Sequence, residues 1–167
     1  MTTARPLAPP PVPSPPPVDP VARESCRLVA DAADLDAHHA VRRTVFVEEQ
    51  SVFAGTDRDD RDDDPLTLHV LGLVDGRPAG SVRLYPIGPG RWKGDRLAVL
   101  PGRRAGRLGI ALVRFAVATA AARGGDRMVA LVQQPNEVFF RRLGWERLAE
   151  PQLYVGIPHV RMDIGLR

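Results

Sequence analysis

The chain has 167 residues, of which 44% are hydrophobic and 26% charged, the composition of an ordinary globular protein rather than of a disordered or fibrous one. No apolar run reaches the ~20 residues of a membrane span and no apolar signal-peptide core is present, so we expect a cytoplasmic protein with no membrane partner. A single cysteine, Cys26, excludes an internal disulfide and a thiolate metal cluster.

The net charge is +3, and every basic residue except Lys93 and the histidines is an arginine. Arginine keeps its charge and binds phosphate through its planar fork, so this composition suits a phosphorylated ligand. A nucleic acid would suit it too, and codon usage in a GC-rich genome would also give such an excess. Because the arginines are dispersed and no stacking aromatics lie between them, we expect no nucleic-acid partner.

Residues 1–21 contain many of the 17 prolines, including two runs of three. Each proline removes an amide donor and fixes φ, which prevents both helix and sheet. We predict a disordered Pro-rich tail over 1–21 and a folded domain over 22–167. Docking to an SH3-like partner is the alternative interpretation of the tail.

The first half of the folded region alternates strand and helix signals. Cys26–Ala30 can form a strand, and Asp34 can cap a helix that runs to about Glu49. An acidic loop, Thr56–Pro65, follows it, and the apolar run Leu66–Val74 predicts a second strand.

The acidic loop has three interpretations. Its six aspartates are Asp57, Asp59, Asp60, Asp62, Asp63 and Asp64. A solvated loop is the interpretation that we favour, and attraction of a cationic amine is the second. Calcium binding is the third, but the glycine and the distal glutamate of an EF-hand are missing, so no metal is predicted.

The second half repeats the alternation. The predicted elements are, in chain order, strands Gly80–Tyr85 and Trp92–Leu100, helix Gly106–Arg123, strand Met128–Gln133, helix Asn136–Leu143 and strand Pro151–Leu166. The whole order is β, α, three strands, α, β, α, β. This order predicts a mixed α/β fold in which helices flank one sheet.

The segment from Arg96 to Gly124 predicts a phosphate site, because a strand leads through a turn rich in glycine and arginine into a helix. The unpaired amides and the macrodipole of a helix N-terminus bind anions, and glycines allow a close approach. A strand–helix junction with surface arginines is the alternative. Neither a P-loop nor a dinucleotide-binding glycine motif is present.

Two motifs resemble those of the GNAT (Gcn5-related N-acetyltransferase) superfamily. The first is Leu97-Ala-Val-x-Pro-x-x-Arg-x-x-x-x-Gly, and the second is Asn136-x-x-Phe-Phe-x-x-Leu-Gly-Trp. The likeness covers Cys26 to Leu166. The segments 41–50 and 156–162 are also similar to a bacterial branch, the nitrogen-starvation-associated subgroup found in nitrilase gene clusters, which implies a role in nitrogen metabolism.

The resemblance implies a central, mixed but mostly antiparallel sheet flanked by helices, and acetyl-CoA as cosubstrate. It implies that the backbone around the thioester and the pyrophosphate comes from Leu97, Ala98, Val99, Arg104, Ala105, Gly106, Arg107, Gly109 and Ile110. Asn136 and Phe140 would lie near the pantetheine or the thiol. Arg107 stands where the family has glycine, and Phe140 stands where many members have a tyrosine that protonates the leaving thiolate.

An amine acceptor has a pKa of ~10.4, so a base or a desolvating site must remove its proton. Our candidates for the catalytic groups are Asp95, His159 and, as substitute acid, Tyr154. Period-two alternation predicts that Asp95 shares a face with Leu97 and Val99. A turn or ion-pair role for Asp95 and a packing role for His159 are the alternatives.

The candidate acceptor-binding residues are Glu48, Glu49, His69 and Arg83. The expected activity is transfer of an acetyl group from acetyl-CoA to the primary amine of a small molecule, by direct attack in a ternary complex. A non-catalytic acyl-CoA-binding or sensing module is the alternative, which Phe140 favours. We expect a monomer or a homodimer.

Overall fold

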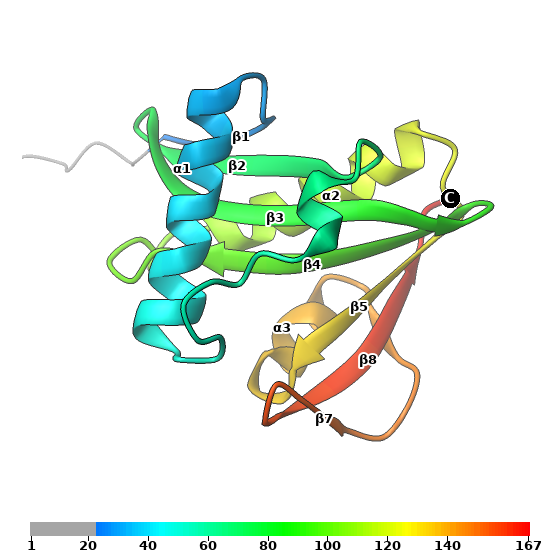
Figure 1. Ribbon diagram of the computed structural model, residues 1–167. Helices are drawn as coiled ribbons and strands as arrows, with labels where there is room; N and C mark the ends of the chain where they lie inside the picture. The colour runs from blue at the N-terminus through cyan, green and yellow to red at the C-terminus, as the bar shows by residue number, and fades with distance from the viewer. Residues whose placement is uncertain (1–22) are drawn as a thin grey trace, which may run out of the picture.

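The computed structural model describes residues 23–167, so the tail predicted for 1–21 lies outside the described residues. One eight-stranded sheet runs in the order β1-β2-β3-β4-β5-β8-β6, and the short β7 pairs with β8 (Figure 1). The strands are β1 (Glu24–Leu28), β2 (Leu68–Val74), β3 (Arg77–Gly88), β4 (Arg91–Val99), β5 (Arg127–Gln133), β6 (Glu146–Arg147), β7 (Gln152–Tyr154) and β8 (Ile157–Gly165). Only β4 and β5 are parallel within this sheet, so the predicted mixed, mostly antiparallel fold is confirmed.

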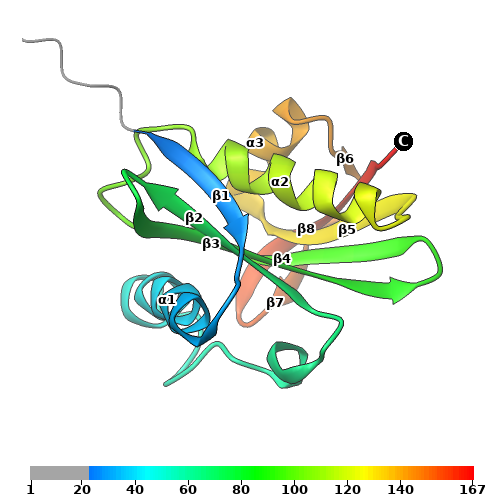
Figure 2. The ribbon, with the colours of Figure 1, turned by 90° about the horizontal axis from the view of Figure 1, so that it is seen from above.

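Helices cover both faces of the sheet (Figure 2). Helix α1 (Ala32–Arg42) lies on one face, and α2 (Leu108–Ala122) and α3 (Glu137–Arg142) lie on the other. We call these the α1 face and the α2 face. None of the helices found between residues 23 and 167 has the length and apolarity to cross a membrane.

Helix α2 packs very closely on the sheet because two glycines lie beneath it. A Cβ added at Gly80 would lie 2.7 Å from Leu112 Cδ1, and one added at Gly72 would lie 3.1 Å from Leu108 Cδ1. Leu108 and Leu112 are fully buried in the main apolar cluster of the α2 face. A side chain at either glycine would therefore push the helix off the sheet.

The start of α1 differs from the prediction. Asp31, rather than Asp34, caps the helix, and its side chain accepts a hydrogen bond from the Asp34 amide at 2.8 Å. Asp34 is buried and binds Arg27 instead, at 2.8 Å. The helix continues through a π-helical segment, Arg43–Glu49, so its predicted end near Glu49 is confirmed.

Strand β4 contains a bulge at Arg96, which has a φ of 51°. The register with β3 shifts between Ser81 and Arg83, so β4 has one extra residue there. The shift places Asp95 on the α1 face, whereas Leu97 packs against the α2-face cluster. The prediction that Asp95 shares a face with Leu97 and Val99 is therefore wrong, because it assumed unbroken alternation.

Strands β4 and β5 separate part-way along their length. Their parallel pairing ends at Gly94 and Ala130, and beyond this point the two strands diverge (Figure 1). β5 continues paired with β8 as far as Gln133. The end of β4 that has no β5 partner leads into the turn before α2. The separation of the two strands therefore lies beside the predicted phosphate site.

Candidate active site

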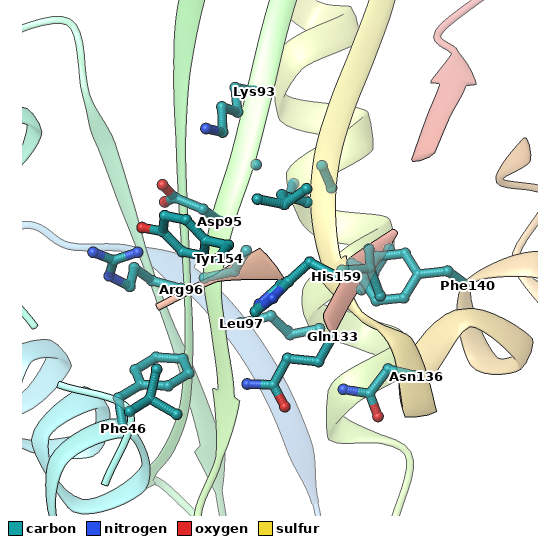
Figure 3. A pocket seen from close by; sticks show the side chains of 18 of the residues that line it. Phe46, Lys93, Asp95, Arg96, Leu97, Gln133, Asn136, Phe140, Tyr154 and His159 are labelled. Atoms are coloured by element: carbon teal, nitrogen blue, oxygen red, sulfur yellow. The ribbon is translucent and has the colours of Figure 1, made fainter. Parts of the chain in front are cut away.

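A cavity of about 150 Å³ lies where β4 and β5 separate (Figure 3). It is lined from both faces of the sheet. The residues from the α1 face include Phe46, Phe53, Lys93, Asp95, Arg96, Tyr154 and His159. The residues from the α2 face include Val82, Val113, Ala116, Met128, Val132, Phe140 and Trp145. The cavity therefore passes through the sheet, with polar groups and two phenylalanine rings on the α1 side and apolar groups on the α2 side.

The turn between β4 and α2 accommodates an arginine at the position where the family has glycine. Arg107, in the family's glycine position, has φ −108° and ψ 11°, a conformation open to any residue. Its N–H donates to both carboxylate oxygens of Glu24, at 2.8 and 3.0 Å. A Cβ at Gly106 would lie 2.0 Å from Glu24 Oε1. An anion thus already lies against an amide that the resemblance assigns to the pyrophosphate.

The predicted acceptor residues Glu48 and Glu49 bind arginines outside the cavity lining. Glu49 pairs with Arg104 at 2.8 Å, and the Nε of Arg104 donates to the Val99 carbonyl at 2.9 Å. Glu48 pairs with Arg43 at 3.2 Å. The ion pair of Glu49 with Arg104 therefore links the end of the π-helical segment to the turn between β4 and α2.

His159 has the geometry of a proton acceptor. It lies on β8, only 5% exposed, and lines the cavity. Its Nδ1 is 2.9 Å from the Ile157 carbonyl, which can only accept, so Nδ1 carries the proton. The lone pair is then on Nε2. The ring of Tyr154, which is 39% exposed, meets the imidazole edge-on with centroids 5.2 Å apart.

Asn136 and Phe140 both line the cavity at its α3 end, as Figure 3 shows. Phe140 is buried and packs edge-on against Trp145, with centroids 5.3 Å apart. Its ring has no proton to give, so an acid for the leaving thiolate must come from another residue or from water.

Asp95 lines the cavity but is bound by other side chains. Arg83 contacts its carboxylate through Nε at 2.7 Å and Nη2 at 2.8 Å, and the Tyr85 hydroxyl donates to it at 3.2 Å. The pairing with Arg83 is the ion-pair role that the sequence analysis gave as an alternative for Asp95. The base role for Asp95 stays a prediction.

Arg83 is 0% exposed, and each of its guanidinium nitrogens has a carboxylate oxygen within 3.0 Å. The carboxylates belong to Asp59, Asp62 and Asp95. These contacts leave Arg83 no free donor for a substrate, although it was a predicted acceptor-binding residue.

The interpretation of the acidic loop as solvated holds for Asp60 and Asp63, which are exposed, but is wrong for Asp57 and Asp62, which are buried in an ion network. Arg42, also 0% exposed, donates to Asp57 at 2.7 Å and to Asp62 at 2.6 and 3.0 Å. Arg96 joins through Asp57 and Asp59. Buried carboxylates need such partners, since an unpaired buried charge is very costly.

Three histidines adjoin this network on the α1 face. Burial, aided by the charge of Arg42, lowers the pKa of His38 to about 3. Burial also lowers the pKa values of His39 and His69. His38 Nδ1 lies 3.0 Å from the Val70 carbonyl, and its Nε2 lies 3.3 Å from His69 Nδ1. His69, a predicted acceptor residue, belongs to this group and not to the cavity lining.

Sequence reasoning missed several lining residues. Gln50, Lys93, Gln133 and Trp145 all line the cavity. Trp145 ends the quoted motif that begins at Asn136, and Gln133 lies three residues before that motif, so their positions in and beside it were the available signal. Among residues 23–167, no group of three or more His, Cys, Asp or Glu side chains is placed to hold a metal ion.

Comparison with known proteins identifies the family. The model of the Acetyltransferase (GNAT) family matches residues 32–145, which include both motifs and the whole wall formed by β4, α2 and β5. The chain belongs to the GNAT family. It is therefore related to acyltransferases that use a CoA-derived acyl donor.

Three relatives illustrate the likeness of this GNAT chain. The Bacillus subtilis (strain 168) protein "Putative acetyltransferase BSU40680" is 28% identical over 141 residues, which cover 81% of this chain and 92% of that protein. The solved "putative N-acetyltransferase from Lactobacillus plantarum" has a TM-score of 0.78 at 23% identity, covering 86% of this chain and 99% of the other. BjaI, a CoA-dependent acyl-homoserine lactone synthase with SAM and isopentyl-CoA bound, has a TM-score of 0.71 at 21% identity, covering 87% and 84%. The two structures share the fold.

Proposed function

We propose that the protein is an N-acyltransferase that moves an acyl group, acetyl in the simplest case, from its CoA thioester to the primary amine of a small molecule. The observation that carries this proposal is the cavity at the separation of β4 and β5, which is lined by Leu97 of β4, by Val113 of α2 and by His159. It provides space for a thioester, and β4 leads from it to the turn before α2, where the pyrophosphate would bind. A cytoplasmic location fits this CoA-dependent reaction.

The donor would bind first through its backbone contacts. The pyrophosphate would take the amides of the turn and of the first turn of α2, residues 104–110, where the helix dipole favours negative charge. The unpaired edge of β4 at Leu97 to Val99 would bind the pantetheine amides. Since β5 leaves β4 after Gly94, these β4 groups have no β5 partner that must be displaced.

The amine would attack from the α1 face. Val160 and Met162 belong to the α2-face cluster, so His159 faces the opposite way by alternation along β8. Its Nε2 would take a proton from the ammonium of the acceptor, so that the neutral amine can attack the thioester carbon, while Nδ1–H stays bound to the Ile157 carbonyl. The tetrahedral intermediate then expels the CoA thiolate. Tyr154, which lines the cavity beside His159, is the proposed acid that protonates this thiolate.

The alternative is a module that binds acyl-CoA without catalysis, which the aromatic ring of Phe140 favours. Calorimetry with acetyl-CoA tests binding, and release of free thiol in the presence of a panel of primary amines tests turnover. Binding with amine-dependent thiol release supports the enzyme. Binding without release for any amine supports the module, and no binding at millimolar acetyl-CoA rejects both.

A further inference from the structure

We propose that the α2-face half of the cavity is an acyl chamber that selects a medium-length chain, so that the preferred donor carries roughly four to six carbons rather than two. This inference rests on the proposed function, because it specifies the donor of the same site. It concerns only the side of the sheet that faces α2.

The acyl chamber exists because the residues that line it where β4, β5 and α2 meet are small, and larger side chains there would fill it. Gly94 and Ala130 form the last β4–β5 pair, and Ala116 of α2 lies in the same lining. A Cβ at Gly94 would lie 3.6 Å from Met128 Sδ, so even one methyl group would come into contact there. Because the side chains at these positions are small or absent, space remains on the α2 face of the sheet.

The wall of this space is apolar. The lining side chains on the α2 face are Val82, Val113, Ala116, Met128, Ala130, Val132, Phe140 and Trp145. All are buried, and none carries a charge. An acetyl group has a single methyl to place against this wall, whereas a longer chain would bury its methylenes against it.

The volume fits such a chain. An apolar cavity of about 150 Å³ holds a six-carbon molecule such as benzene, and the whole cavity, its polar and apolar sides together, has that volume, which is therefore an upper limit for the chain. The thioester itself uses part of the space, which sets the range of chain lengths. The Nε1 of Trp145 is buried in this wall without a partner among the described residues. Buried unpaired donors are rare, so this N–H is available to a water molecule or to an oxygen of the occupant.

The opposite side of the cavity suits a chain less well. There the lining includes Lys93, Asp95 and Arg96, and Asp95 and Arg96 belong to the ion network. A hydrocarbon chain placed among these groups would keep them from water without offering hydrogen bonds. The acyl chain is therefore directed to the α2 face and the polar amine to the α1 face.

The test is the affinity of the full-length protein for acetyl-, butyryl-, hexanoyl- and decanoyl-CoA, measured by calorimetry without any acceptor. Each buried methylene adds up to about fourfold in affinity. We expect hexanoyl-CoA to bind at least about tenfold more tightly than acetyl-CoA, and decanoyl-CoA to gain nothing further.

Two substitutions at Ala116 test where the acyl chain binds. Ala116→Phe should bring the hexanoyl-to-acetyl affinity ratio to near one, and Ala116→Val, a smaller change that the fold tolerates better, should move the preferred chain to a shorter length. Ala118→Phe is the matched control, because Ala118 is an exposed residue of the same helix, and it should leave the ratio unchanged.

The outcomes separate the two proposals. If no CoA thioester binds, the proposed function fails. If all bind but acetyl-CoA binds as tightly as hexanoyl-CoA, or if Ala116→Val leaves the preference where it was, only the acyl chamber is rejected.

Discussion

The two faces of the sheet are built from opposite chemistry. On the α2 face, helix and strands meet through aliphatic side chains and glycines, with no charged residue in the buried cluster. On the α1 face, two fully buried arginines, Arg42 and Arg83, are held among aspartates, with three histidines beside them. The apolar face gains stability from burial alone, whereas the polar face depends on every charge having its partner.

The cavity joins these two environments, which is the arrangement that the proposed acyl transfer to an amine would use. Acyl transfer to an amine needs a polar, positioned environment for the attacking group and an apolar one for the acyl chain. The ion network fixes the loop 57–62 against β3 and β4, and Arg96 of that network packs over the Phe53 ring at 4.7 Å. Phe53 lines the cavity, so the network also positions part of the α1-face wall.

The largest expected effect tests whether proton transfer belongs to the α1 face. His159→Asn keeps an amide donor near the Nδ1 position for the Ile157 carbonyl but has no nitrogen lone pair. We expect kcat to fall by about 10²- to 10⁴-fold with the best amine, while the Kd for the CoA thioester changes little. Thiol-release kinetics and calorimetry on the same preparation measure the two. A kcat within about threefold of the parent would remove His159 from the mechanism.

The second effect tests the ion network. Arg42→Met leaves Asp57 and Asp62 buried without their main partner, which should lower the free energy of unfolding by about 3–5 kcal/mol in urea titrations. Arg43→Met is the matched control, since Arg43 is exposed and makes a surface pair with Glu48. Its expected cost is below about 1 kcal/mol. Equal losses for the two variants would contradict a structural difference between buried and surface pairs here.

The third effect concerns pH. The folded protein keeps His38 neutral down to about pH 3, whereas the unfolded chain protonates it near its ordinary pKa of about 6.5. Between these values the unfolded state binds more protons, so stability that is fully present above pH 6.5 is lost as the pH falls. At pH 5 the loss from His38 is about 2 kcal/mol.

Carboxylates of the network act in a lower window. Burial raises the pKa of Asp62, but hydrogen bonds and charge from Arg42 outweigh this and hold it below the ordinary value. The stability from Asp62 is thus lost only below about pH 4. Urea unfolding at pH 7.5 and pH 5 should show a smaller loss for His38→Asn than for the parent. The same loss in both would mean that His38 is not the titrating group.

The smallest effect concerns Glu24, whose carboxylate lies against the turn between β4 and α2. Because it accepts from the Arg107 amide, it would compete with a pyrophosphate bound at the proposed coenzyme site. Glu24→Gln removes the charge, and we expect CoA to bind about two- to fivefold more tightly in low salt. Glu48→Gln, a change at an exposed carboxylate that pairs with Arg43, is the control. Weaker binding by Glu24→Gln would show that Glu24 supports the coenzyme site.

The main helices and strands of both faces were predictable from the sequence, and the ion network on the α1 face was not. Leu108 and Leu112 follow helical periodicity, and β2 is a near-continuous apolar run, so local pattern indicated these elements. The predicted single strand Pro151–Leu166 is instead the pair of strands β7 and β8. Burial of Asp57 and Asp62 depends on Arg42, which lies 15 and 20 residues away. No local pattern separates these aspartates from Asp60 and Asp63, which are exposed.

The candidate site also contains residues that local sequence motifs predicted and features that depend on tertiary contacts. The turn, Asn136 and Phe140 were found because they belong to contiguous motifs. The face of Asp95 was mispredicted because the bulge at Arg96 depends on its pairing with β3, which the sequence of β4 does not reveal. His159 was proposed from its residue type, but the tautomer that would allow it to act as a base depends on the Ile157 carbonyl, a feature of the folded hairpin.

A crystal structure with hexanoyl-CoA bound tests the central claim most directly, namely that the cavity divides the reaction between the two faces. The account predicts the pyrophosphate at the amides of residues 104–110 and the acyl chain on the α2 face between Ala116, Met128 and Trp145. The thioester carbon would lie in the separation between β4 and β5, open toward His159. A chain placed on the α1 face beside Phe53, or a coenzyme bound outside this separation, would contradict it.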